Sequence, residues 1–246
     1  MESLGVVIKP AAAASAHALA PARPLAEPER RSRGRGVARK PPAAQEDEAA
    51  QAAADELPAR GFSAELAAHL ALFQRLGELD GVVAEAAERL GACLSAGGKL
   101  LICGNGGCAS AAQHMAAELA GDGGRERRPL AALALCADGA ALSGSASACG
   151  FDKVLARQVQ ALGRAGDALL LLHAGGAADN LALAAQVARD TGLLTLGLVR
   201  SDSGDLLPLC HLAITVPADG DARVEEAQAF IAHALCGLIE ARLGLA

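Results

Sequence analysis

Residues 99–119 read KLLICGNGGCASAAQHMAAEL, and this stretch decides the fold class. Residues 99–103 form a short apolar segment typical of a buried strand. A Gly-Asn-Gly-Gly turn at 104–107 follows, and a helical pattern then runs to Leu119. Glycines allow close backbone approach to a ligand, and N–H groups at a helix start attract anions. The turn by itself leaves a binding role and a simple chain reversal equally open.

The same alternation of strand and helix continues along the chain. We expect two leading helices, the first with Ser63 as its N-cap, and later helices ending near residues 162, 189 and 243. Further strands are expected at residues 130–136, 167–172, 193–199 and 211–216. Strands that are apolar throughout and alternate with helices predict a doubly wound, mainly parallel five-stranded α/β sheet flanked by helices. In such sheets, ligands bind at the C-terminal ends of the strands.

Composition narrows the functional classes. The formal net charge of -6 over 246 residues argues against a nucleic-acid-binding surface spread over the chain. The seven cysteines are odd in number and form no CxxC pair, which is typical of reduced thiols in a cytoplasmic protein. No apolar run reaches the ~18–20 residues of a membrane span, and no secretory signal opens the chain. We expect a cytoplasmic protein without membrane or nucleic-acid partners.

The N-terminal quarter differs in composition from the rest. Residues 1–44 are rich in Ala, Pro and Arg, with a basic run at 30–36, and acidic residues follow at 46–48. This composition predicts a disordered tail and linker over residues 1–61, followed by one folded domain over 62–246. The basic run would suit nucleic-acid contact or organellar targeting. Acidic residues interrupt it, however, and we favour a solvated tail without function.

Four residues on two helices are candidate ligands. His114 and Glu118 are four apart and share a helix face, as a metal site requires, although such pairs are common on exposed helices. Glu225 and His233 are eight apart on the terminal helix, about 80° around its axis. His233 has apolar neighbours, and a histidine there is more often a core residue with a satisfied partner than a ligand.

The motif at 103–119 resembles the signature of bacterial phosphoheptose isomerases, which carry a sugar isomerase (SIS) domain. Further matches follow in the family's order at residues 150–152, 161–167 and 223–226. The resemblance covers residues 62–243 and implies the SIS fold. It also implies a homotetramer that isomerises sedoheptulose 7-phosphate to an aldoheptose 7-phosphate, with one Zn²⁺ per subunit.

The resemblance assigns roles to individual residues. It implies His114, Glu118, His233 and Glu225 as metal ligands, with Glu225 standing where the family has glutamine. Glu118 and His233 are implied as the catalytic proton-transfer pair. A metal polarises a carbonyl while a base and an acid move the proton, as ketose–aldose exchange requires. The implied substrate-binding residues are Asn105, Gly106, Gly107, Glu118, Gly175, Gly176 and Glu225.

Several substrate-holding positions depart from the family pattern. The second phosphate loop, residues 172–180, reads LHAGGAADN and contains no hydroxyl. Cys108 replaces a serine, and Ala222 replaces an aspartate. Each lost hydrogen bond to a charged group costs ~1.5–3 kcal/mol. The backbone N–H groups of the loop and a protonated His173 are the candidate replacements.

Three functions therefore remain open. The first is a metal-dependent sugar-phosphate isomerase, which the retained Glu118 and His233 favour. The second is a catalytically weak sugar-phosphate-binding or regulatory domain, which the lost hydroxyls favour. The third is an interaction protein like the replication-initiator-associating relatives of this family. Residues 236–240 of this chain resemble the terminal helix of those relatives. We place the isomerase first.

Overall fold

The computed structural model describes residues 61–121, 126–218 and 220–245. All of the predicted tail except Gly61 lies outside these residues. The five strands are β1 (Leu100–Gly104), β2 (Ala132–Ala134), β3 (Ala168–His173), β4 (Leu194–Arg200) and β5 (Leu212–Val216). They form one sheet in the order β2-β1-β3-β4-β5, and each neighbouring pair is parallel. The prediction of a doubly wound parallel sheet is confirmed.

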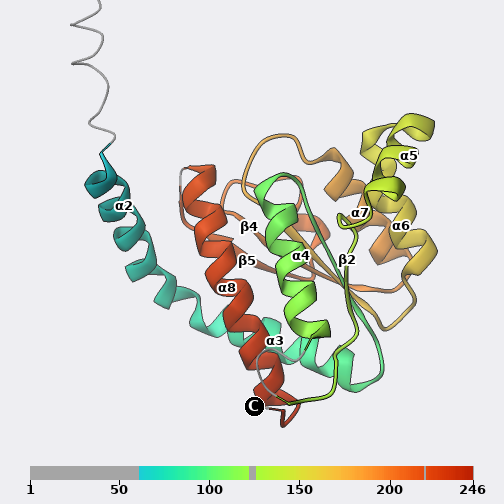
Figure 1. Cartoon of the computed structure of the whole chain (residues 1–246), viewed down its shortest axis with the longest axis horizontal. Helices are drawn as coiled ribbons and strands as arrows, with labels where there is room; N and C mark the ends of the chain where they lie inside the picture. Colours follow the sequence, from blue (N-terminus) through green and yellow to red (C-terminus); the bar gives the residue numbers. More distant parts are fainter. Residues whose placement is uncertain (1–60, 122–125, 219, 246) are drawn as a thin grey trace, which may run out of the picture. The chain divides into compact units, whose positions relative to one another are not determined.

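Alternate residues of each inner strand face opposite layers, as the two-residue period of a strand requires. Leu170 and Leu172 of β3 face one core, and Leu169 and Leu171 face the other. The first core is covered by α3 (Asp80–Ser95), α4 (Gly107–Ala120) and α8 (Asp221–Arg242). The second is covered by α6 (Val154–Leu162) and α7 (Asp179–Asp190) (Figure 1). Both faces of the sheet are therefore buried.

Two local predictions differ from the structure. The first helix, α2 (Phe62–Arg75), begins one residue before Ser63, so the N-cap is Gly61 and the predicted serine cap is wrong. The helix α5 (Gly139–Cys149) was not expected, because its small residues carry no apolar period and none of them is buried. The 3₁₀ turns Leu76–Leu79, Phe151–Lys153 and Leu207–Leu209 complete the elements. Within the described residues, no helix is long and apolar enough to cross a bilayer.

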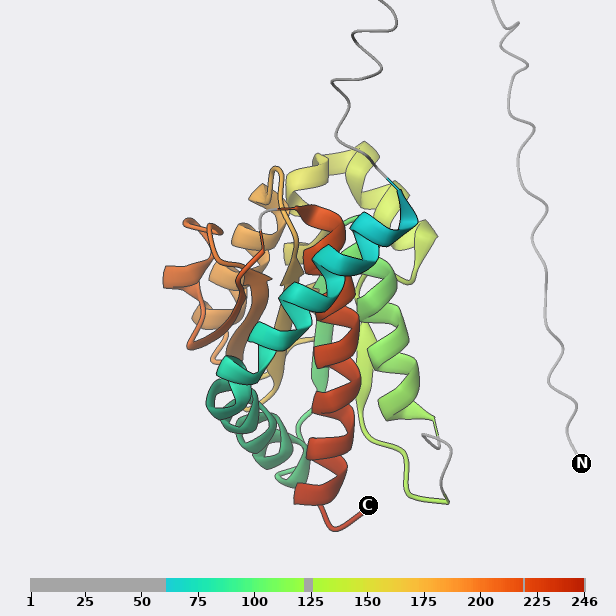
Figure 2. The same cartoon turned by 90° about the vertical axis from the view of Figure 1, so that its left-hand side faces the viewer.

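The helix α2 lies across α8 on the outer side of the first layer (Figure 2). The His69 side chain donates a hydrogen bond of 2.7 Å to Glu226 and stacks on Phe73. Phe73 in turn contacts Phe230 of α8, with ring centroids 5.3 Å apart. Phe62, Leu66 and Leu70 of the same helix remain exposed. One side of α2 is therefore anchored on α8, and another presents apolar side chains outward.

A buried carboxylate joins the starts of β1 and β3, at the sheet edge opposite the glycine turn. Asp167 is 5% exposed and accepts hydrogen bonds from the Lys99 side chain at 2.5 Å and the Lys99 backbone N–H at 2.9 Å. The backbone N–H of Arg164 donates a further bond. Burial opposes ionisation, but these donors outweigh it and lower the pKa of Asp167.

This shift predicts an acid-sensitive contribution to stability. A lowered pKa in the folded state means that ionised Asp167 stabilises the fold above the ordinary aspartate value of about 3.9, and that this contribution is lost as the pH falls further. Asp167→Asn should lower the free energy of unfolding at pH 7 by about 2 kcal/mol. The variant should also lose less stability than the wild type between pH 5 and pH 3. Urea denaturation at each pH measures both effects, and parallel pH profiles would contradict the prediction.

Candidate metal and substrate site

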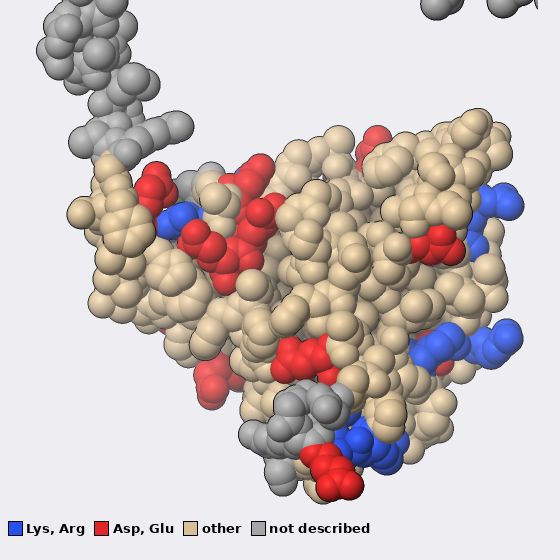
Figure 3. Space-filling model, viewed as in Figure 1, with Lys and Arg blue, Asp and Glu red and all other residues tan. Residues whose placement is uncertain are grey.

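The C-terminal ends of β1 and β3 meet the first half of α8, and the predicted site residues lie in two groups, one around the glycine turns and one further along α4 and α8. The turn after β1 uses Gly106 with φ 55°, a left-handed conformation that favours glycine. Gly107, which opens α4, packs directly against the carboxylate of Glu225, so a side chain at position 107 would collide with it. Acidic residues gather over the N-terminal turns of α8, where Asp221, Glu225 and Glu226 lie (Figure 3).

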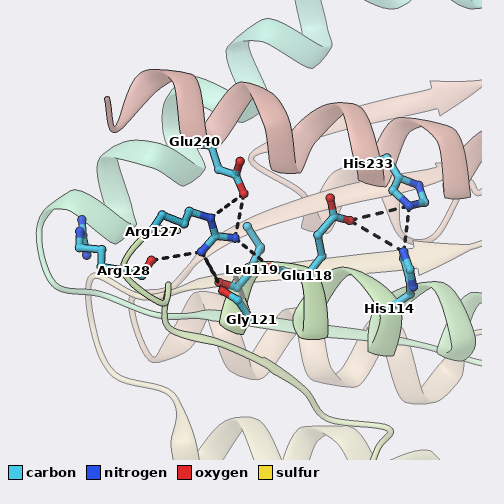
Figure 4. A network of polar contacts seen from close by, with 8 residues as sticks. All are labelled: His114, Glu118, Leu119, Gly121, Arg127, Arg128, His233 and Glu240. Carbon is cyan, nitrogen blue, oxygen red and sulfur yellow. Dashed lines mark hydrogen bonds and ion pairs between the residues drawn. The ribbon is translucent and has the colours of Figure 1, made fainter. Parts of the chain in front are cut away.

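Three predicted ligands form one cluster. His114 and Glu118 lie one turn apart on α4, and His233 faces them from α8 (Figure 4). The two imidazole Nε2 atoms are 2.8 Å apart, and each lies 3.8 Å from Oε2 of Glu118. Among the described residues, these three form the group able to hold a metal ion together. The structure thus brings together residues that are more than a hundred positions apart.

The donor atoms fit a zinc ion. A point equidistant from three atoms so spaced lies about 2.0 Å from each, close to Zn–N and Zn–O bond lengths of ~2.0–2.2 Å. Nδ1 of His233 lies 2.8 Å from the carbonyl oxygen of Ala229, which can only accept, so Nδ1 carries the proton in the neutral ring. Nε2 of His233 therefore presents its lone pair to the cluster. This second contact orients the ring, as is usual for metal-binding histidines.

The Glu118 carboxylate supports the same conclusion. Its Oε2 atom is buried and has no hydrogen-bond partner, which is costly for a carboxylate oxygen unless a cation shares the site. The thiol of Cys236 lies beside this carboxylate, and burial followed by the Glu118 charge raises the pKa of that thiol. Cys236 therefore stays protonated at neutral pH and adds no negative charge to the cluster.

Glu225, the fourth predicted ligand, is not part of this cluster. It lines a cavity of about 210 Å³ with the two glycine loops, Cys108 and Asp221. Its carboxylate contacts Gly107, and its charge is the second cause, after burial, that raises the pKa of Cys108 to about 11. Its assignment as a zinc ligand stays a prediction. Its place in the cavity suits the predicted substrate contact.

The two glycine loops are tied to each other by side-chain amides. Asn105 and Asn180 exchange hydrogen bonds of 2.9 and 2.8 Å, each amide N–H donating to the oxygen of the other. Asn105 thus connects the end of β1 to the first turn of α7. The predicted substrate-binding role of Asn105 remains a prediction, and the structure adds an ordering role.

The hydroxyl-free loop after β3 is covered by an ion pair. Arg200, at the end of β4, donates hydrogen bonds to Asp202 and Asp221, the latter at 2.6 Å. The guanidinium of Arg200 and the carboxylate of Asp221 occupy the space that a side chain at Gly175 would need. Burial and then the Arg200 charge lower the pKa of His173, which holds its ring neutral at pH 7. The expected cation of this loop is therefore Arg200 rather than His173.

Sequence reasoning did not identify Arg200 or Gln228. Gln228 is fully buried in α8, donates to the carbonyl oxygens of His173 and Leu198, and accepts from Cys108 at 3.2 Å. Its signal was a polar residue within the apolar face of a helix, because such a residue must find partners inside the fold. The sequence signal for Arg200 was a charged residue directly after an apolar strand segment.

Comparison with known proteins agrees with this geometry. A family model described as the SIS domain matches residues 66–199. A phosphoheptose isomerase of Helicobacter hepaticus is 40% identical over 183 residues, which cover 74% of this chain and 93% of that protein. A phosphoheptose isomerase of Campylobacter jejuni is 42% identical over 172 residues, which cover 70% of this chain and 92% of that protein. The chain belongs to the phosphoheptose isomerase family of SIS-domain proteins.

A solved structure of a family member matches the fold as well. The phosphoheptose isomerase of Neisseria gonorrhoeae superposes with a TM-score of 0.69 at 34% sequence identity. The match covers 73% of this chain and 96% of that one. The predicted family and fold are thereby confirmed.

The cluster predicts a specific metal content. Wild-type protein purified with Zn²⁺ should hold about one zinc ion per chain, and His233→Ala should hold far less, because two protein ligands bind zinc much more weakly than three. Elemental analysis after gel filtration measures the content. His211→Ala is the control, since His211 lies at the start of β5 and accepts a hydrogen bond from the backbone N–H of Thr195. Equal zinc in wild type and His233→Ala would contradict the site.

Proposed function

We propose that the chain is a metal-dependent isomerase that converts sedoheptulose 7-phosphate into an aldoheptose 7-phosphate. One observation carries the proposal: a member of the phosphoheptose isomerase family brings His114, Glu118 and His233 together in one cluster, and two of these residues lie on the helix that follows the first glycine loop. The relatives named above are phosphoheptose isomerases over nearly their full length. A likeness this extensive supports the same sugar phosphate as substrate.

The residues of the cluster suit the proton transfers of this reaction. Ketose–aldose exchange moves a proton between neighbouring carbons while the carbonyl on one becomes a hydroxyl and the hydroxyl on the other becomes the carbonyl. A bound zinc ion would polarise that carbonyl. Glu118 has two carboxylate oxygens, so one can face the imidazoles while the other accepts the proton. His233 takes and returns a proton at Nε2, because Nδ1 is held by Ala229. Metal binding and proton transfer by His233 belong to different stages, since one lone pair cannot serve both.

Substrate binding is proposed in the cavity between the two glycine loops. Gly106 and Gly175 line this cavity and allow close backbone approach, Gly107 contacts the Glu225 carboxylate, and Gly176 lines a second cavity. We assign Glu225 to the sugar hydroxyls. The phosphate needs a cation because acidic residues surround the start of α8 (Figure 3). Arg200 is the proposed cation: it lines a second cavity with His173 and Gly176, and its guanidinium lies against Gly175. Its partners Asp202 and Asp221 are largely exposed, and exchanging an exposed carboxylate for a phosphate costs little.

The oligomeric state and cellular location are proposed on similar grounds. The exposed apolar side chains Phe62, Leu66 and Leu70 of α2 and Phe230 of α8 suit burial between subunits, which supports a homotetramer. The seven free cysteines suit the reducing cytoplasm.

Turnover tests the proposed function directly. Wild-type protein loaded with Zn²⁺ should isomerise sedoheptulose 7-phosphate, and Glu118→Gln should reduce kcat by about 10²–10⁴-fold, the usual contribution of a general base. A coupled assay for the aldoheptose product measures both. Wild-type turnover no higher than that of Glu118→Gln would contradict the isomerase. In that case, saturable binding of the sugar phosphate would favour the regulatory binding domain, and retention of replication initiator protein would favour the interaction protein.

The role given to Arg200 has its own test. Arg200→Leu should raise KM for the sugar phosphate about tenfold or more and change kcat less, because one hydrogen bond to a charged group contributes ~1.5–3 kcal/mol. Arg89→Leu is the matched control, since Arg89 pairs with Glu85 on the surface of α3. Steady-state kinetics of the three proteins measure KM and kcat. An unchanged KM in Arg200→Leu would show that the phosphate is held elsewhere.

A further inference from the structure

A buried ion pair joins the two helices that carry the metal cluster, at a distance from the cluster itself. Arg127 follows the C-terminus of α4, and Glu240 lies in the last turns of α8. Their side chains are 1% and 7% exposed. Nε of Arg127 donates a hydrogen bond of 2.8 Å to Oε1 of Glu240, and Nη2 forms an ion pair with the same oxygen at 2.8 Å. The pair is thus withdrawn from water and held by two contacts.

The same guanidinium binds the end of α4. The last carbonyl groups of a helix have no partner within it. Nη2 of Arg127 donates to the carbonyl oxygen of Glu118 at 2.8 Å, and Nη1 donates to those of Leu119 and Gly121 at 3.1 Å. Nη1 of Arg127 also donates a hydrogen bond to the carbonyl oxygen of Arg128. The cation also complements the negative end of the helix dipole. One side chain therefore caps α4 and pairs with α8.

These contacts bear directly on the cluster. Glu118, whose carbonyl Arg127 holds, also supplies the carboxylate of the cluster, and Glu240 lies seven residues after His233, about two helical turns (Figure 4). At the other end of α4, the bond from Cys108 to Gln228 joins the same two helices. The cluster lies between two buried polar contacts, which together oppose sliding of α4 along α8.

Stability alone does not account for the ion pair. Burying two charges costs desolvation energy, and apolar residues of similar volume often replace such a pair without loss of stability. A metal site, in contrast, needs its ligands placed within about 0.5 Å, and hydrogen bonds from surrounding residues contribute to this placement together with packing. The directional bond to the backbone of Glu118 is of this kind.

We propose that Arg127 and Glu240 are positioning residues of the metal centre, which set the offset between α4 and α8 so that His114, Glu118 and His233 converge. The proposal rests on the proposed function, because it assigns these residues to the same zinc site. They touch neither metal nor substrate and act through Glu118 and α8.

The test separates positioning from stability with three variants. Arg127→Met combined with Glu240→Met removes both charges and leaves apolar side chains in their place. It should unfold at the wild-type urea midpoint or above it. It should bind Zn²⁺ about 10–100-fold more weakly, the usual effect of losing an outer contact of a metal site. Arg127→Lys keeps the charge but supplies fewer donors to the α4 carbonyls, and its affinity should be intermediate.

Lys99→Met is the matched control, because it breaks the ion pair between Lys99 and the buried Asp167. That pair lies at the starts of β1 and β3, away from the contact between α4 and α8. It should lower the urea midpoint and leave zinc affinity unchanged. Zinc affinity is measured by competition with a chromophoric chelator, and site geometry by the visible absorption of the Co²⁺-loaded protein. This absorption should change in the double variant, less in Arg127→Lys, and not in Lys99→Met.

Two outcomes would overturn the positioning role. One is wild-type zinc affinity and Co²⁺ absorption in the double variant. The other is an equal loss of affinity in Lys99→Met, which would trace the effect to general destabilisation. A wild-type protein that binds no zinc would instead overturn the metal centre of the proposed function, and this proposal with it.

Discussion

The packing of α4 against α8 is the contact on which the rest of the site depends. Both helices cover the same face of the sheet and run parallel, because both follow parallel strands. Ala112 and Ala116 of α4, and Ala227 and Ala232 of α8, are buried there, and small side chains let the helix axes approach closely. The approach brings ligands from opposite ends of the domain sequence within bonding distance of one ion. It also buries polar groups, which is why directional contacts are needed at both ends.

Much of this architecture could be predicted from local pattern. The strand, glycine turn and helix at 99–119 indicated a parallel sheet and a site at its C-terminal edge, and the spacing of His114 and Glu118 placed two ligands on one face. His233 was different. Nothing local distinguishes it from a core histidine, and only the family resemblance connected it to the others. Arg127 and Glu240 were missed because their significance lies in partners more than a hundred residues apart, which no periodicity reveals.

The hydroxyl-free loop illustrates a second limit of reading residues singly. The absence of Ser and Thr at 172–180 indicated a weakened phosphate site. In the folded chain, the space above Gly175 is filled by the pair of Arg200 and Asp221. A side chain at 175 would require this ion pair to shift. The positive charge beside the loop therefore comes from another strand, a contribution that the loop sequence alone does not reveal.

The position of this charge has an electrostatic consequence for the whole site. The metal cluster carries one carboxylate, and the start of α8 adds Asp221 and Glu225 at the cavity between the glycine loops. These acids favour a cation and oppose a phosphate dianion. With His173 held neutral, the phosphate site that we propose has Arg200 as its cation, paired with its acidic neighbours before substrate arrives and with the phosphate afterwards. Under that proposal, affinity for the sugar phosphate depends on partner exchange at one guanidinium, and substrate preference can change at this position while the metal cluster stays intact.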